Sequence, residues 1–148
     1  MPLLYKDCLA KGLLKKIPPS HDKAKRSIMK AQRWLDEARG TFKAKAFDSS
    51  VLSSYLVMFH AARAILFLDG FRERSHICIA RYLEEKYVKT KKLEKTWVDL
   101  LDHYREIRHS DQYDLSFIST DSEAREALNV ASRFLGRIKN IFLKEGSL

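Results

Sequence analysis

The sequence predicts an all-α fold, an up-and-down bundle of four to five helices, on three observations. Apolar residues recur at alternating steps of four and three in every long segment, which is the spacing of one helix face. No segment alternates apolar and polar residues as a half-buried strand does. The connections between the periodic segments are short, as they are between antiparallel helices. A chain of 148 residues can bury one such core, so we expect no second domain.

The first long helix should begin after Ser20, which follows Pro18 and Pro19 and can cap free backbone N–H groups with its hydroxyl. A single stripe buries one side of a helix and leaves the other side in water. Here the stripe consists of Ala24, Ile28, Ala31, Leu35, Ala38 and Phe42.

The next segment carries two adjacent apolar stripes, so it should be the central helix of the bundle. Asp48 or Ser49 can cap its start, and Gly70 can take the left-handed conformation that ends it. One stripe consists of Val51, Tyr55, Met58, Ala62 and Ile65, and the other of Leu52, Leu56, Phe59 and Leu66.

Three further helices follow. Ser75 can cap a shorter helix over about 76–88, and the stripe of the next one runs from Leu93 to Ile107, where the polar stretch SDQYDLSF interrupts it. The last helix opens with Thr120 and Glu123 in capping-box spacing, and Gly146 marks its end.

We expect residues 20–146 to form the bundle and residues 1–19 to form a basic N-terminal segment that can contain a short helix. Cys8 and Cys78 lie in different predicted elements without CxxC or Cys/His spacing. The sequence therefore indicates neither a disulfide framework nor a zinc site, and we expect no metal, no cofactor and a reducing, cytoplasmic location.

The net charge of +9 is concentrated at the front of the chain: residues 1–45 hold 12 Lys and Arg against 4 Asp and Glu, and residues 46–148 hold 16 against 15. Clustered cations suit a polyanionic partner, because they release counterions from a phosphate backbone. A solvated, lysine-rich helix face is the alternative. Asp7 and several lysines interrupt the N-terminal apolar residues, so we expect no signal peptide and no contact with a membrane.

The chain has no Gly-rich phosphate loop, HExxH or GxSxG motif, which excludes the enzyme classes that these motifs announce. The most informative stretch is DHYREIRHSDQYD at 102–114. Arg108 borders the apolar stripe and should emerge into a groove, where a half-buried guanidinium needs an anion. Arg105 and His109 share another face, and a turn could fold the Tyr113 hydroxyl towards Arg108. Pairing of either arginine with Asp111 or Asp114 at the helix end is the structural alternative.

A second polar cluster surrounds the end of the central helix. His60 and Arg63 lie on that helix, Arg74 lies in the connection after it, and His76 follows the connection. A polar strip on an apolar helix is unusual, although His60 can also be a satisfied, half-buried histidine.

Three blocks of the sequence resemble the prokaryotic HEPN family, whose name stands for higher eukaryotes and prokaryotes nucleotide-binding. The blocks are the stretch from AQRWLDEARG to FLDGF with FHAARA inside it, ERSHICIARYLEEKYVK, and YREIRHSDQYD, and the resemblance covers about residues 24–143. It implies a helical bundle that is usually dimeric. Many members are metal-independent ribonucleases of toxin–antitoxin or defence systems, with an arginine followed after four to six residues by a histidine.

This chain departs from that motif, because Tyr113 stands where a histidine is expected after Arg108, and His109 comes too early after Arg105. Tyrosine, with a pKa near 10, is a poor base at neutral pH, whereas His109 has the better pKa in the wrong place. The resemblance implies Arg108, His109 and Tyr113 as catalytic candidates, and Arg105, Arg63, Arg74 and His76 as phosphate-binding candidates.

The expected function is that of an RNA- or nucleotide-associated homodimer, a toxin–antitoxin or defence component with metal-independent endoribonuclease activity. The alternative that the Tyr-Asp ending implies is a non-catalytic binding partner of a separate small nucleotidyltransferase. A helical subunit whose charged groove has no ligand is the third reading.

Overall fold

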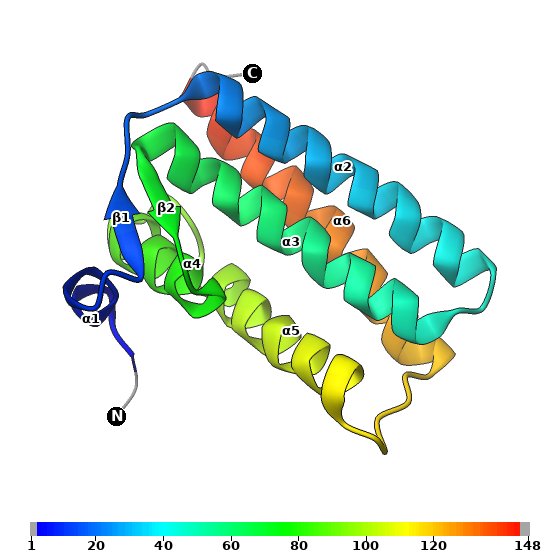
Figure 1. The fold of residues 1–148 in the computed structure, drawn as a ribbon. Helices are drawn as coiled ribbons and strands as arrows, with labels where there is room; N and C mark the ends of the chain where they lie inside the picture. Colours follow the sequence, from blue (N-terminus) through cyan, green and yellow to red (C-terminus); the bar gives the residue numbers. More distant parts are fainter. Residues whose placement is uncertain (1–2, 146–148) are drawn as a thin grey trace.

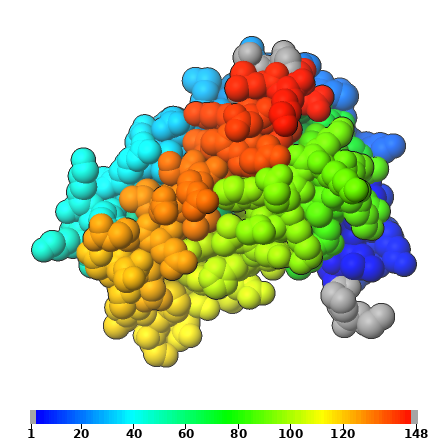
Figure 2. Space-filling view, turned by 180° about the vertical axis from the view of Figure 1, so that it is seen from behind, coloured from blue at the N-terminus to red at the C-terminus, as the bar shows by residue number. Residues whose placement is uncertain are grey.

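The computed structural model describes residues 3–145, and its bundle is built from four helices (Figure 1). They are α2 (His21–Lys43), α3 (Phe47–Asp69), α5 (Lys95–Tyr113) and α6 (Asp121–Lys144). In Figure 1, α3 lies between α2 and α5, and α6 lies behind α2 and α3. Figure 2 shows the opposite face, where α6 lies between α2 and the α4–α5 region. The prediction of an all-α bundle is confirmed.

The helix ends follow the local signals of the sequence at three places. The hydroxyl of Ser20 accepts a hydrogen bond of 3.0 Å from the backbone N–H of Lys23. Gly70 ends α3 with φ 88°, a conformation that favours glycine. Thr120 and Glu123 form the predicted capping box of α6. The predicted end at Gly146 lies outside the described residues.

The start of α3 differs from the prediction. Ala46, and not Asp48 or Ser49, precedes the first turn, and no side chain caps it. The carboxylate of Asp48 instead accepts a hydrogen bond of 2.8 Å from the backbone N–H of Ser119. Asp48 therefore bonds to a residue distant in the sequence and does not cap its own helix.

The central helix α3 packs against α2, α6, α5 and α4 and carries most of the core. By length and composition α3 could cross a membrane, but 67% of its apolar window is buried inside the protein. Residues of both predicted stripes are buried, as expected for a helix that has other helices on most of its sides. Its fully buried side chains include Tyr55, Met58, Ile65 and Leu66.

The structure contains two short strands that the sequence did not predict. β1 (Leu14–Lys16) and β2 (Phe71–Glu73) pair antiparallel, with Leu14 opposite Glu73. Three residues are too few to show strand alternation, and their pairing depends on the chain returning from α3. Gly70 permits that return, because a Cβ atom there would lie 2.7 Å from the carbonyl oxygen of Ile17.

The N-terminal helix α1 (Tyr5–Ala10) is joined to α4 (His76–Leu83) by a disulfide between Cys8 and Cys78. The expectation that these cysteines stay unpaired is wrong. Both residues are fully buried, and their Cα atoms lie 5.9 Å apart, within the range that a disulfide spans. No pattern in the sequence predicts this disulfide, because two cysteines separated by 70 residues can lie near or far apart in the fold.

The shorter predicted helix over 76–88 is α4 followed by the π-helical turn η1 (Glu84–Val88). The next helix, α5, continues into the first half of the stretch 110–117 that was predicted to interrupt it and ends at Tyr113. Its last turns stay helical although Ser110, Asp111 and Gln112 contribute no apolar stripe. This extension determines where His109 and Tyr113 lie.

Candidate phosphate-binding site

Arg108 lies on the side of α5 that faces α3, with its guanidinium carbon 5.4 Å from the centre of the Tyr55 ring. The side chain is half-buried, and its Nε is buried without a hydrogen-bond partner. Within residues 3–145, no carboxylate lies within ion-pair distance of Arg108. A buried guanidinium N–H without an acceptor is costly, so Arg108 is a candidate donor to an anion.

His76, the first residue of α4, completes the cluster from a different element. Its Nδ1 lies 3.0 Å from the Tyr55 hydroxyl, and its ring stacks on Phe59 with centroids 4.1 Å apart. Burial, together with the nearby charges of Arg108, Arg63 and Arg105, lowers the pKa of His76 to about 4. The imidazole is therefore neutral at pH 7.

Tyr55 holds the centre of this arrangement. Burial raises its pKa to about 12, against the opposing effect of the Arg108 and Arg105 charges. The hydroxyl therefore keeps its proton at neutral pH. With Tyr55 as donor to Nδ1, the other ring nitrogen of His76 carries the proton and is a donor for an oxyanion.

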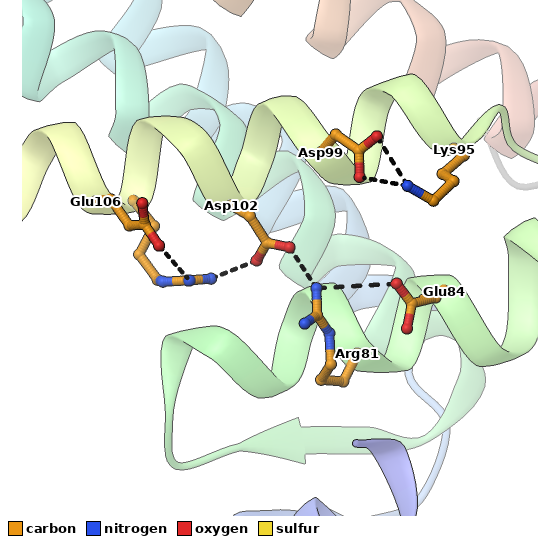
Figure 3. A network of polar contacts seen from close by, with 7 residues as sticks. Arg81, Glu84, Lys95, Asp99, Asp102 and Glu106 are labelled. Carbon is orange, nitrogen blue, oxygen red and sulfur yellow. Dashed lines mark hydrogen bonds and ion pairs between the residues drawn. The ribbon is translucent and has the colours of Figure 1, made fainter. Parts of the chain in front are cut away.

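Asp102, which pairs with Arg81 (Figure 3), also holds Arg105, one turn later on α5, beside this cluster. The distance from Arg105 Nη1 to Asp102 Oδ1 is 2.5 Å, and Asp102 also pairs with Arg81 of α4. One carboxylate thus serves two guanidinium groups in this trio, and Glu84, at 3.9 Å from Arg81, and Glu106, at 3.9 Å from Arg105, add two further negative charges. The half-buried trio also fixes α4, and with it His76, against α5.

Arg63 lies within electrostatic range of His76 and is paired with Glu73 of β2, with 2.6 Å between Arg63 Nε and Glu73 Oε1. Burial raises the pKa of Glu73, and Arg63 opposes that change. Arg74, the next residue, is exposed, and the described part of the chain gives it no ion-pair partner. Nothing places Arg74 at the cluster.

His109 and Tyr113 lie on the outer side of α5, with ring centroids 5.0 Å apart. Tyr113 is 67% exposed. The expected turn that would bring its hydroxyl to Arg108 is absent, because α5 continues through it.

The two acidic residues proposed as alternative partners of the arginines are engaged elsewhere. Asp114 accepts hydrogen bonds from the backbone and hydroxyl of Ser116. Burial raises the pKa of Asp111 to about 6, and the neighbouring carboxylate of Asp48 contributes to the increase. Arg108 therefore remains unpaired at the helix end.

The structure thus brings together Arg108, Arg105 and His76, which the sequence placed in two separate clusters. It leaves Arg74, His109 and Tyr113 at the surface around them. Tyr55 was missed, because its position in an apolar stripe indicates only core packing. A tyrosine hydroxyl in the most buried helix needs a polar partner, and that requirement was the signal available.

The fold is thus a small helical bundle in which a half-buried arginine, without an ion-pair partner among residues 3–145, lies near a neutral histidine. The family model described as HEPN domain matches residues 24–141, so the chain belongs to the HEPN domain family. A relative from Methanocaldococcus jannaschii named "Putative toxin MJ0142" is 21% identical over 121 residues, which cover 82% of this chain and 82% of that protein.

Proposed function

We propose that this protein is a toxin-type HEPN protein that binds RNA or a nucleotide through a phosphate group held by Arg108, with Arg105 and His76 beside it. The family assignment and the name of the archaeal relative support this class. One observation is the main support for the site: the guanidinium of Arg108 is half-buried and has no carboxylate partner among residues 3–145.

The chemistry of the cluster suits phosphate better than a carboxylate or a neutral ligand. Arg108 offers a fork of N–H donors that matches two phosphate oxygens. The neutral His76 can donate one further N–H, and Arg105 adds a second guanidinium nearby, which Asp102 and Glu106 hold in place. A bound phosphate also accepts the hydrogen bond that Arg108 Nε lacks.

Cleavage of RNA at this site follows from the same arrangement and needs no metal. A base takes the proton of a 2′-hydroxyl, the oxygen attacks the adjacent phosphorus, and the 5′-oxygen leaves with a proton. Arg108 stabilises the charge of the phosphorane. His109, which is exposed and follows Arg108 in α5, is the candidate base, and His76, whose protonated form a bound phosphate favours, is the candidate acid that gives the 5′-oxygen its proton.

The test is cleavage and binding of labelled RNA in the presence of a chelator. Arg108→Gln, His76→Gln and His109→Gln are compared with the parent, and His103→Gln serves as the control because it removes another exposed histidine of α5. Arg108→Lys keeps the charge and loses the fork. We expect Arg108→Gln to abolish binding and His103→Gln to leave it intact.

Binding or cleavage that survives Arg108→Gln contradicts the proposed site. Loss of cleavage without loss of binding in His109→Gln supports His109 as the base, and the same result in His76→Gln supports His76 as the acid. Binding without cleavage by the parent supports a binding function and removes the ribonuclease activity from the proposal.

The second candidate function is docking on a separate protein, a nucleotidyltransferase in the non-catalytic reading. The connection between α5 and α6 favours it, because Tyr113, Leu115 and Ile118 are 67%, 104% and 78% exposed. Neighbouring exposed apolar side chains mark protein contacts. A second copy of this chain would use the same surface in a homodimer.

Leu115→Asp/Ile118→Asp tests this surface without touching the core, since both side chains are exposed. Light scattering should show a dimer for the parent and a monomer for the double variant. If a nucleotidyltransferase from the native host copurifies with the parent but not with the double variant, the docking function is favoured. A monomeric parent that retains no partner removes both the homodimer and the docking function.

A further inference from the structure

A groove between α2 and α3 is lined almost entirely by cationic and aromatic side chains. It has a volume of about 220 Å³. No carboxylate lines it, and four of its residues carry a positive charge at neutral pH. The lining consists of Lys23, Arg26, Ser27, Lys30, His60, Arg63 and Phe67.

The charge of this α2–α3 groove is only partly balanced. Arg26 pairs with Asp22 at 2.9 Å, and Arg63 pairs with Glu73. Lys23 and Lys30 form no ion pair within the described part of the chain. Four cations against two carboxylates leave a surplus of two positive charges.

The groove lies on the face of the helix pair that α6 does not cover. Gln32 of α2 contacts Lys139 of α6, and Lys30 lies about 200° away from Gln32 around the helix. In Figure 1, α6 is correspondingly behind α2 and α3. An extended ligand therefore has access along the length of the groove.

Packed aromatic rings and guanidinium groups connect the groove to the Arg108 cluster. Arg63 lies over Phe67 at 5.1 Å and over Phe59 at 5.6 Å. The Phe59 ring contacts His60 at 4.9 Å and His76 at 4.1 Å, measured between centroids. His76 in turn reaches Tyr55, over which Arg108 lies. Each step is a direct contact, so packed side chains, among them the buried Phe59 and Tyr55, join the two sites.

The contiguity is also electrostatic. Burial lowers the pKa of His60 to about 4, and the charges of Arg63 and Lys30 act in the same direction. The same Arg63 acts on His76, together with Arg108. One positive field therefore covers the groove and the cluster.

We propose that the α2–α3 groove is a second phosphate-binding site, which holds the backbone of a single-stranded RNA whose neighbouring phosphate lies at Arg108. This inference rests on the proposed function of the Arg108 cluster and extends it from a single phosphate to a strand. From Tyr55 to Phe67, α3 rises roughly 18 Å. That length exceeds a single nucleotide, so an extended strand places more than one phosphate along it, whereas a mononucleotide would occupy one end.

A single strand suits the groove better than a membrane or an acidic peptide. Proteins commonly bind single-stranded nucleic acid with cations along the phosphate backbone and aromatic rings on which the bases stack. Phe67 and the His60 ring are half-buried and border the groove. A membrane surface is flat, and an acidic peptide offers no rings to stack.

The experiment compares two double variants of equal charge change on the same helix. Lys23→Gln/Lys30→Gln removes the two unpaired lysines of the groove, and Lys25→Gln/Lys43→Gln removes two exposed lysines of α2 that do not line it. The probes are oligouridylates of about three and about twelve nucleotides, with uridine monophosphate as the single-phosphate ligand. Fluorescence anisotropy and competition over a range of salt concentrations give the affinities.

The parent should bind the longer oligouridylate more tightly than the shorter one. Lys23→Gln/Lys30→Gln should lower the slope of log affinity against log salt by about 1.4, that is 0.7 for each lost phosphate contact. It should also remove most of the length dependence and leave uridine monophosphate binding unchanged. The matched control should keep the parent slope.

If Lys23→Gln/Lys30→Gln keeps the parent's salt-dependence slope and Arg108→Gln abolishes binding, the second phosphate-binding site in the groove is contradicted. The proposed function of the Arg108 cluster is then unaffected. Binding that survives Arg108→Gln and is lost in the groove variant supports the groove and overturns the proposed function. Binding of the parent to phosphatidylserine vesicles or polyglutamate, with none to oligouridylate, overturns both.

Discussion

The disulfide between Cys8 and Cys78 should provide a large part of the stability of the chain. Linking two residues 70 positions apart restricts the unfolded chain, and loop-closure entropy gives a contribution of roughly 4 kcal/mol at 25 °C. For a chain of this size, each kcal/mol shifts the melting temperature by about 2–4 °C. Reduction should therefore lower the melting temperature by about 8–16 °C.

The assay is thermal and urea unfolding of the oxidised and the fully reduced protein. Both cysteines are fully buried, so reduction needs prior opening, and thiol titration must confirm it. Cys8→Ala/Cys78→Ala should melt near the reduced protein, lower by the packing that the two sulfur atoms provide. Equal melting temperatures of the oxidised and reduced protein would refute the contribution assigned to this cross-link.

Two further predictions concern groups near the site. Asp102→Asn should cost about 1–3 kcal/mol of unfolding free energy, because it leaves the half-buried Arg81 and Arg105 without their shared partner. Asp99→Asn, which breaks an exposed pair with Lys95 on the same helix (Figure 3), should cost under about 1 kcal/mol, and equal losses in urea unfolding would contradict the role of Asp102. The raised pKa of Asp111, about 6, means that the fold favours its neutral form, so stability should fall as pH rises from about 4 to above 6. Asp111→Asn should flatten that fall and stabilise the protein at pH 7.5, and an unchanged pH profile would contradict the effect assigned to the half-buried Asp111 beside Asp48.

The local signals of the sequence predicted the helices well, because each depends on residues close together in the chain. Ser20, Gly70 and the Thr120–Glu123 capping box act within one turn of a helix end. Features that depend on distant residues were not predictable. The β1–β2 pair, the disulfide and the contact between Asp48 and Ser119 all join residues more than 50 positions apart.

In the candidate site, too, features that depend on nearby residues were predictable and features that depend on distant residues were not. Arg108 was expected to emerge from the edge of the core, and its helical spacing from Tyr104 is a local property. That His76 lies beside Arg108 follows from β2 returning the chain along α3, which no spacing in the sequence reveals. The extent of α5 was also misjudged, since a polar stretch can remain helical when its neighbours hold it. Tyr55 shows that an apolar stripe can contain a polar group of the site.

The most direct test of the anion site is the pKa of His76, measured by NMR titration with and without uridine monophosphate. In the free protein, burial and the Arg108 charge should hold this pKa near 4. A phosphate between Arg108 and His76 favours the protonated ring, so the pKa should rise towards 6.5, its value in water, and binding should tighten as pH falls through that range. Arg108→Gln should raise the pKa of the free protein and abolish the ligand-dependent change. A His76 pKa that stays the same with saturating nucleotide would contradict the assignment of Arg108 and His76 to one phosphate-binding site.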